Sequence, residues 1–328
     1  MKELGLAILG CGPMGSDLAR QIDQIPGAQL AAVVDIDVAK AQALADELGV
    51  EALSDANQAL ARKDIDAVII ATPGSTHAEW TIRAFDAGKH VFVEKPMALQ
   101  AADCERMIQA ARTAARKLMV GQVLRYYHVF AYAGELFRQG RLGEPSSIRI
   151  TRTTFGWGGW MRPWRASVEQ CGGVLFEVSI HELDFMLHLF GEATEVHSFA
   201  NHTVIGELDY PDTVVVNLRF ASGAIAQLTA GLADRIGSYA GEIVGTEGSV
   251  HFNARRGEIL VRIGAEELRT INFGDLELEH PVRREVREFI DAVRDDRPVT
   301  IPGEEGLRVV RVACAAVQSA GTGKIVRL

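Results

Sequence analysis

Long apolar runs are missing from this chain of 328 residues, and cysteine and aromatic residues are scarce. No stretch approaches the roughly 20 apolar residues of a membrane-spanning helix, and no cleavable leader is recognisable, so we expect a cytoplasmic protein without a membrane partner. The four cysteines, Cys11, Cys104, Cys171 and Cys314, are scattered and form no CxxC pair. This spacing argues against a disulfide framework and against a cysteine zinc site.

Basic residues are fewer than acidic residues in this chain. The chain has 34 Lys and Arg against 43 Asp and Glu, which gives a formal net charge of −9. A phosphate backbone calls for a basic surface, so nucleic acid is not an expected partner. A hydrophobic content of 48% with 23% charged residues is typical of a soluble globular protein, and the length predicts about two domains.

The first third of the sequence alternates strand-like and helix-like segments. The expected strands are 6–9, 30–34, 67–71, 91–93 and 119–120, and the expected helices are 14–25, 38–48, 77–87 and 101–117. Strands that alternate with helices predict βαβ units, and therefore a doubly wound parallel sheet with helices on both faces. We assign this α/β domain to residues 1–122.

The pattern changes after residue 122, where strands follow one another without regular intervening helices. The expected strands are 148–154, 195–204, 213–220, 224–230, 242–244 and 249–252, and the expected helices are 126–139, 172–190, 283–294 and 304–320. Ser222-Gly223 between two alternating runs is typical of a hairpin. Residues 123–328 therefore predict a second α/β domain with an open, mainly antiparallel sheet, whose last helices are candidates for packing back onto the first domain.

A glycine turn follows the first expected strand. Gly10 to Gly15 fits G-x-G-x-x-G, a helix follows it, and Asp35 ends the next strand. This context indicates a Rossmann dinucleotide site, in which the helix start receives the pyrophosphate and the acid binds the ribose. Because Asp35 and Asp37 repel a 2′-phosphate, NAD is favoured over NADP. The expected contacts are Gly10, Gly12, Pro13, Met14, Gly15, Asp35 and Ile36.

Three further stretches add a resemblance. Thr72 to His77 follows one strand, Glu94-Lys95-Pro96 follows another, and Gly172-Gly173 precedes His181. With the glycine turn, this order resembles the glucose-fructose oxidoreductase/inositol dehydrogenase (Gfo/Idh/MocA) family over the whole chain. The resemblance implies a Rossmann domain followed by an α/β domain with an open sheet that mediates dimer or tetramer contacts. It also implies a sugar or cyclitol substrate that lies over the nicotinamide.

Carried over residue by residue, the resemblance implies catalytic roles for Lys95 and His181. Where the family has D-x-x-x-H, this chain has Glu177 four residues before His181, and its extra methylene leaves two roles open: orienting His181 or binding a substrate hydroxyl. Oxidation of a secondary alcohol needs a base and a stabiliser for the developing alkoxide. We therefore expect His181 to act as general acid/base and Lys95 as its electrostatic partner.

The cofactor edge of the first domain has further candidates. Thr72, Pro73, His77, Glu94 and Lys95 are expected near the dinucleotide, although His77 at a helix start is equally a capping and packing residue. Pro96 fixes the backbone after Lys95, and the resemblance makes a cis Lys95-Pro96 bond plausible.

The segment 172–190 is expected to form one helix with Glu177, His181, Asp184 and His188 on one face. Satisfied hydrogen bonds between helices are an alternative explanation for Asp184 and His188. The spacing is not H-E-x-x-H, so we expect no metal.

An aromatic loop precedes this segment and concentrates three of the four tryptophans. Its expected substrate contacts are Trp157, Trp160, Arg162 and Trp164, with Arg125 and Tyr127 as weaker candidates. Aromatic faces stack on the C–H faces of sugars and arginines reach hydroxyls. Packing at a subunit interface is the alternative for this loop.

The sequence thus predicts an NAD-dependent dehydrogenase acting on a hydroxyl of a sugar, sugar derivative or cyclitol, which assembles as a homodimer or homotetramer. An NAD-dependent glycosidase that uses transient oxidation is the first alternative. A regulator that binds the dinucleotide without catalysis is the second, and such a protein has no need for Lys95 and His181.

Overall fold

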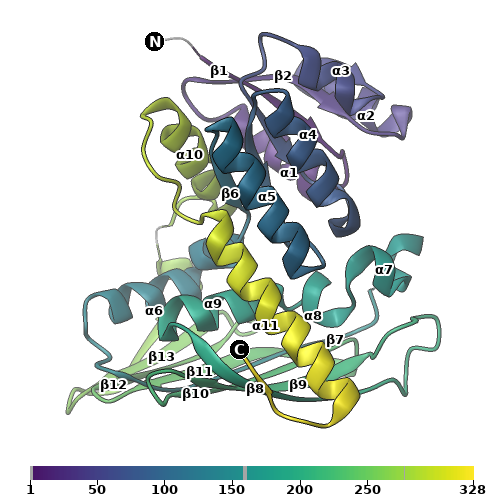
Figure 1. The fold of residues 1–328 in the computed structure, drawn as a ribbon. Coiled ribbons are helices and arrows are strands. Elements are labelled where there is room, and N and C mark those ends of the chain that lie inside the picture. The colour runs from purple at the N-terminus through teal and green to yellow at the C-terminus, as the bar shows by residue number, and fades with distance from the viewer. Residues whose placement is uncertain (1–2, 158–160, 277) are drawn as a thin grey trace. The chain divides into compact units, whose positions relative to one another are not determined.

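The computed structural model describes residues 3–157, 161–276 and 278–328, and Figure 1 shows its ribbon. The chain divides into two compact units. Unit 1 contains Met1–Val123 and Glu279–Arg308, and unit 2 contains Leu124–Leu278 and Val309–Leu328. Trp160, an expected substrate contact, lies outside the described residues.

Unit 1 contains a sheet of six parallel strands in the order β3-β2-β1-β4-β5-β6. Its strands are β1 Leu4–Leu9, β2 Ala28–Val34, β3 Glu51–Leu53, β4 Ala67–Ile70, β5 His90–Val93 and β6 Leu118–Val120. The central strands are apolar throughout because helices cover both faces, and Ile8, Ile69 and Phe92 are fully buried. This strand order is that of the doubly wound dinucleotide-binding fold.

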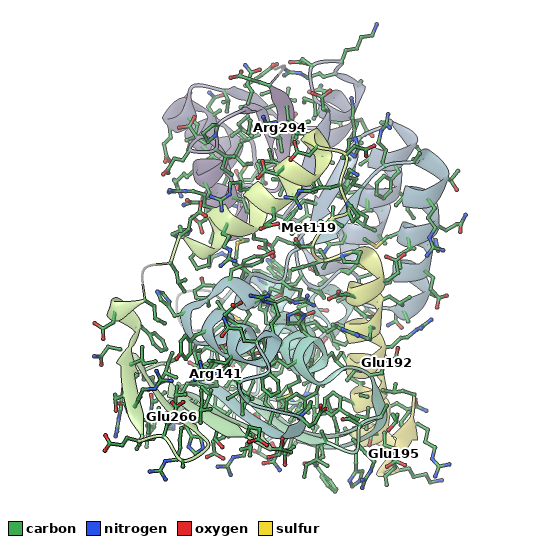
Figure 2. All side chains as sticks on the ribbon, turned by 90° about the vertical axis from the view of Figure 1, so that its left-hand side faces the viewer. Met119, Arg141, Glu192, Glu195, Glu266 and Arg294 are labelled. Carbon is green, nitrogen blue, oxygen red and sulfur yellow. The ribbon has the colours of Figure 1, made fainter. Side chains whose placement is uncertain are left out.

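The helices of unit 1 connect these strands and then return from the end of the chain. They are α1 Pro13–Ile22, α2 Val38–Leu48, α3 Ala56–Ala61, α4 His77–Asp86, α5 Ala101–Ala114, α10 Pro281–Arg294 and the start of α11 Gly303–Thr322. Phe289 of α10 packs edge-on against Phe92 of β5, with ring centroids 5.8 Å apart. Met119, labelled in Figure 2, forms an isolated bridge to Pro302 just before α11. The last helices therefore complete the core of the first sheet.

Unit 2 contains a sheet of nine strands in the order β14-β13-β12-β11-β7-β10-β9-β8-β15. Its strands are β7 Pro145–Phe155, β8 Ala193–Asn201, β9 Thr213–Phe220, β10 Ile225–Gly231, β11 Ala233–Gly245, β12 Gly248–Asn253, β13 Glu258–Ile263, β14 Arg269–Asn272 and β15 Val326–Arg327. Only the β7–β10 pair is parallel among these described strands. The expected fold class is therefore confirmed: a Rossmann parallel sheet and a mainly antiparallel one.

One face of the nine-stranded sheet is covered and the other is open. The covering helices are α6 His128–Arg138, α8 Val174–Glu177, α9 Ile180–Phe190 and the second half of α11, as Figure 1 shows. Ser198 of β8 fixes α11, because its hydroxyl donates to the Ala316 carbonyl at 2.8 Å and its N–H donates to Ser319 Oγ at 3.0 Å. The opposite face has no helix among the described residues. Ion pairs such as Arg141 with Glu266, labelled in Figure 2, lie at the surface of this unit.

Several element boundaries differ from the sequence-based expectation. The predicted strands and helices of unit 1 are present within a few residues, but β3 and α3 were missed because both are short. In unit 2, β13, β14 and β15 were also missed. The helix expected over 126–139 begins at His128, because a 3-10 turn at Val123–Tyr126 precedes it.

Candidate active site

The turn after β1 depends on two close backbone approaches. Gly10 has φ +100°, and a Cβ atom there would lie 2.6 Å from the Ala71 carbonyl oxygen at the end of β4. A Cβ on Gly15 would lie 1.8 Å from the Gly10 carbonyl oxygen, so no side chain fits between α1 and the turn. Glycine at both positions lets the helix start directly at the strand end.

The third glycine faces open space. A Cβ built on Gly12 meets no described atom within 4 Å, and no side chain caps α1 at this residue. Pro13 occupies the first helical position, and Met14 follows it. The first N–H groups of a helix have no intrahelical acceptors and carry partial positive charge. The start of α1 therefore leaves N–H donors available to an anionic group.

Asp35 is held at the end of β2 by two backbone groups. Its carboxylate accepts the Cys11 N–H and the Asp37 N–H, both at 2.8 Å. Ile36 beside it is 96% exposed, which leaves an apolar side chain available to a planar ring. Burial, and next the charge of Asp35, raises the pKa of the Cys11 thiol to about 12, so this cysteine stays protonated. The arrangement fits a dinucleotide whose ribose binds Asp35.

His77 joins the loops that follow β4 and β5. It is buried in the first turn of α4, with Nδ1 2.7 Å from the Pro96 carbonyl oxygen and Nε2 2.8 Å from the Thr72 carbonyl oxygen. A neutral ring can donate to only one of these oxygens, whereas a protonated ring donates to both. Thr72 and Thr76 share a hydroxyl contact of 2.7 Å in the same loop. His77 is thus a packing residue that holds the two loops together.

Lys95 lies two residues after the end of β5, at the same edge of the sheet. The Lys95-Pro96 bond is cis, and the Lys95 N–H donates to Oε2 of Glu94 at 3.1 Å. Glu94 is buried, whereas Lys95 is partly exposed. Strands β1, β4 and β5 are parallel neighbours. Their following loops therefore bring the glycine turn, Thr72–Pro73 and Lys95 to one edge, where open α/β sheets bind ligands.

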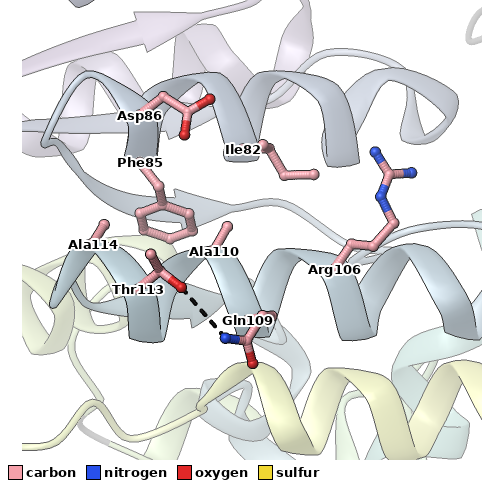
Figure 3. Close-up of a pocket in the computed structure, with 8 residues that line it drawn as sticks. All are labelled: Ile82, Phe85, Asp86, Arg106, Gln109, Ala110, Thr113 and Ala114. Atoms are coloured by element: carbon pink, nitrogen blue, oxygen red, sulfur yellow. Dashed lines mark hydrogen bonds between the residues drawn. The ribbon is translucent and has the colours of Figure 1, made fainter.

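Two hollows in unit 1 lie away from this edge. One, of about 550 Å³, runs between α4 and α5 and is shown in Figure 3. It is lined by Ile82, Phe85, Asp86, Arg106, Gln109, Ala110, Thr113 and Ala114. The other, of about 340 Å³, borders the beginnings of β1 and β5 at Leu4 and His90. Helices that follow strands run back along the sheet, so the α4–α5 hollow includes the helix ends remote from the carboxyl edge.

In unit 2, the expected helix over 172–190 is broken, which corrects the sequence-based prediction. Gly172 and Gly173 have φ of 76° and 79°, α8 ends at Glu177, and α9 begins at Ile180 after Ser179 leaves helical geometry. Glu177 therefore does not continue the polar face of α9. Its Oε1 accepts the Arg165 Nε–H at 2.9 Å, from the loop before α7 Val168–Cys171.

The remaining polar residues of α9 have different environments. His181 is buried in its first turn, whereas His188 is exposed in its last turn. Asp184 is buried and receives two hydrogen bonds from the Arg125 guanidinium, at 2.6 and 2.7 Å. A buried carboxylate without its partner costs several kcal/mol, about 3–5 when an ion pair is broken. The ion pair with Arg125 therefore accounts for the burial of the Asp184 carboxylate, and it gives Arg125 a structural role.

The aromatic loop is tied to the rest of unit 2. Trp157 Nε1–H donates to the Tyr210 hydroxyl at 3.2 Å, and the Trp164 ring lies under the Arg165 guanidinium. Arg162 is exposed and donates to the neighbouring Met161 carbonyl, and Tyr127 precedes α6 with 42% of its surface exposed.

Two groups in unit 2 were missed by sequence reasoning. Arg165 was passed over as one arginine among several in its loop. Glu182, next to His181, is fully buried, and its Oε1 accepts both Arg152 Nη1–H at 2.8 Å and the Tyr239 hydroxyl at 2.9 Å. Burial, and then the charge of Glu182, raises the pKa of Tyr239. The available signal was an acid that lies outside the predicted polar face of His181, Asp184 and His188.

Comparison with known proteins places this geometry in a family. The NAD-binding Rossmann model of the Gfo/Idh/MocA oxidoreductases matches residues 4–122, and the model of the C-terminal domain of that family matches residues 130–251. The chain belongs to the Gfo/Idh/MocA family. It is therefore an oxidoreductase whose first unit binds NAD.

Relatives and solved structures support this family membership over the whole chain. A 2,7-anhydro-N-acetylneuraminate hydratase of Mediterraneibacter gnavus is 33% identical over 76% of this chain and 67% of its own. The myo-inositol 2-dehydrogenase of Thermotoga maritima is 28% identical over 98% of both chains. A levoglucosan dehydrogenase solved with NADH and levoglucosan superposes with a TM-score of 0.90, 25% identity and 99% coverage of both chains.

Two features are absent from the part of the chain that the structure describes. No helix there is long and apolar enough to span a lipid bilayer. No group of three or more His, Cys, Asp or Glu residues there is arranged to hold a metal ion.

Proposed function

We propose that this Gfo/Idh/MocA enzyme oxidises a secondary hydroxyl of a cyclitol, sugar or sugar derivative with NAD. The proposal depends on one observation at the carboxyl edge of the first sheet. Strands β1, β4 and β5 are parallel neighbours, so the glycine turn after β1 and Lys95 after β5 lie at the same edge. Relatives named as inositol and levoglucosan dehydrogenases support the substrate class. Bound NAD supplies the hydride acceptor, and the protein supplies the proton and charge chemistry.

His181 is proposed as the group that removes the hydroxyl proton. It begins α9 and is buried, and an imidazole is suited to proton transfer near neutral pH. Lys95 is proposed to stabilise the negative charge that develops on the substrate oxygen. His77 connects Pro96, the residue after Lys95, to Thr72 in the neighbouring loop, which limits how far the backbone at Lys95 can move.

The test of this proposal is a screen of myo-inositol, scyllo-inositol, levoglucosan and glycosides with NAD and with NADP. We expect reduced nicotinamide to accumulate with at least one cyclitol or sugar and with NAD. Binding of NAD without reduction by any compound of the panel would contradict the dehydrogenase assignment.

A second candidate function has its own support. Two relatives at 32% and 33% identity are named as 2,7-anhydro-N-acetylneuraminate hydratases, a name that describes addition of water without net oxidation. Transient oxidation that assists bond cleavage in a glycoside would likewise leave NAD unchanged after each turnover. The screen separates the two functions, because cleavage of a glycoside without accumulation of reduced cofactor supports the second.

Asp35 is proposed to set the preference for NAD. Its carboxylate is fixed at the end of β2 by the two N–H groups, where it can accept hydrogen bonds from ribose hydroxyls and repel a 2′-phosphate. In Asp35→Ala, we expect the ratio of kcat/KM for NAD to that for NADP to fall by about tenfold or more, the effect of one charged hydrogen bond. Asp46→Ala, an exposed acid on α2, is the control. If this ratio stays at its wild-type value in Asp35→Ala, Asp35 does not bind the ribose of the cofactor.

Assembly into a homodimer or homotetramer is proposed through the open face of the second sheet. Phe199, Val215 and Ile225 lie on that face, and Phe199 and Ile225 are 60% and 53% exposed. Exposed apolar side chains on a broad flat surface favour association with a second copy. Sedimentation velocity should give a mass of two or four chains, and Phe199→Glu should lower it; a concentration-independent monomer would refute the assembly.

A further inference from the structure

Arg165 lies between two aromatic rings of the loop. It belongs to a 3-10 turn, Pro163–Ala166, and its guanidinium carbon is 4.4 Å from the ring centroid of Trp164 and 5.4 Å from that of Trp157. A guanidinium over an indole face is attracted by the ring and restrains its orientation. One cation thus restrains two of the three tryptophans that the loop contains.

The guanidinium is also anchored to the segment before α9. Arg165 Nε–H donates to Glu177 Oε1 at 2.9 Å, and the two side chains are only 16% and 8% exposed. A carboxylate buried to this degree needs a partner, because an unpaired charge there is costly. The Arg165 side chain therefore links the loop to the end of α8.

The backbone of Arg165 is held from the other side. Its carbonyl oxygen accepts the Tyr210 hydroxyl at 2.6 Å, and that hydroxyl accepts Trp157 Nε1–H at 3.2 Å. Burial raises the pKa of Tyr210, so its hydroxyl stays protonated and continues to donate. Asp209 adds two contacts, accepting the Val168 N–H at 2.7 Å and donating its own N–H to the Ala166 carbonyl. These bonds fix Trp157, Arg165 and the segment 166–168 relative to Asp209 and Tyr210.

We propose that Arg165 is a positioning residue that holds Trp157 and Trp164 as a preformed aromatic wall for the substrate ring, with Glu177 as its anchor. This inference rests on the proposed function, since a saturated polyol ring offers the C–H face that stacks on an indole. It also assigns Glu177 a role as a hydrogen-bond acceptor for Arg165 in place of proton transfer. The length of the glutamate supports this, because an aspartate would withdraw the carboxylate by about one bond, ~1.5 Å.

The test compares Arg165→Lys with Glu177→Gln, and uses Arg138→Lys, at an exposed arginine of α6 in the same unit, as the control. Lysine keeps the positive charge but loses the planar fork and its stacking, so we expect KM for myo-inositol to rise about tenfold. The kcat value should stay within about threefold of wild type, because the wall contributes to binding rather than chemistry. Tryptophan emission should move to longer wavelength in Arg165→Lys as the indoles gain water, and stay unchanged in Arg138→Lys.

Glu177→Gln separates anchoring from proton transfer. Glutamine still presents a carbonyl oxygen to Arg165 but cannot carry a proton, so we expect kcat and the pH–rate profile of this variant to resemble those of wild type. A fall in kcat of a hundredfold or more, the low end for losing a general acid or base, would overturn the anchor role. An unchanged KM and an unchanged emission spectrum in Arg165→Lys would show that Arg165 does not position Trp157 and Trp164 for substrate binding.

The emission readout also keeps this proposal distinct from the proposed function. Tryptophan emission and its quenching by acrylamide are measured in the free enzyme, where no turnover is required. If myo-inositol is not oxidised, levoglucosan serves as the second probe. Failure of both to reduce NAD contradicts the dehydrogenase function, whereas a wild-type spectrum in Arg165→Lys contradicts the positioning role.

Discussion

Replacing His181 with alanine should lower kcat by about 10²- to 10⁴-fold, the range for losing a general acid or base. His181 is the buried histidine at the start of α9, and no other histidine lies on that helix except His188. Binding of NAD should survive, since the residues expected to hold NAD lie in unit 1 and His181 lies in unit 2. Steady-state kinetics and an NAD titration measure the two effects separately.

His188→Ala is the matched control for this variant. It removes the same side chain from the same helix, but at an exposed position in the last turn. We expect turnover of His188→Ala to remain near that of wild type, and the acidic limb of the pH–rate profile to persist in it. The limb should disappear in His181→Ala. Equal losses in the two variants, or an unchanged rate in His181→Ala, would show that His181 does not transfer the proton.

Lys95→Ala should give the second large effect, a loss of about 10²- to 10³-fold in kcat, as expected for removing one group that stabilises an oxyanion. The charge on the substrate oxygen develops only in the transition state, so kcat and kcat/KM should fall together. Lys95→Arg should recover part of the rate, because it restores the charge without the geometry of the ammonium.

Lys63→Ala provides a control from the same unit. Lys63 is exposed and lines the hollow that borders the beginnings of β1 and β5, at the edge opposite to the proposed site. Its loss should leave kcat and the KM for NAD unchanged. A Lys95→Ala enzyme that turns over at the wild-type rate would exclude Lys95 from the chemistry, whatever the control shows.

The strand, glycine turn and helix at the start of the chain were predictable because their signals are local. A strand, a glycine turn and a helix lie within a single short stretch from Leu4 to Ile22, and Asp35 closes the next strand. The alternation of strands and helices then predicts a parallel sheet, and the carboxyl ends of parallel neighbours share an edge. What the local pattern does not contain is the contact of His77 with Pro96, which depends on the packing of two loops.

The contacts of unit 2 were less accessible from the sequence. The Glu182 carboxylate accepts hydrogen bonds from Arg152 on β7 and Tyr239 on β11, which are paired residues of neighbouring strands. The sequence of α9 contains no information about which strand residues lie next to it. The break at Ser179 was missed because the apolar period continues across it. The role of Arg165 depends on its contacts with Tyr210 and Glu177, which lie in separate segments of the sequence.

The central claim is that hydride passes from a hydroxyl-bearing carbon of the substrate to NAD. The most direct measurement is a reaction with myo-inositol or levoglucosan that is deuterated at its ring carbons, followed by mass spectrometry of the nicotinamide product. We predict one deuterium in each reduced nicotinamide formed by the wild-type enzyme, and a much slower appearance of the same product with His181→Ala and Lys95→Ala. Reduced cofactor without deuterium, or no reduced cofactor from either compound while NAD is bound, would contradict the account.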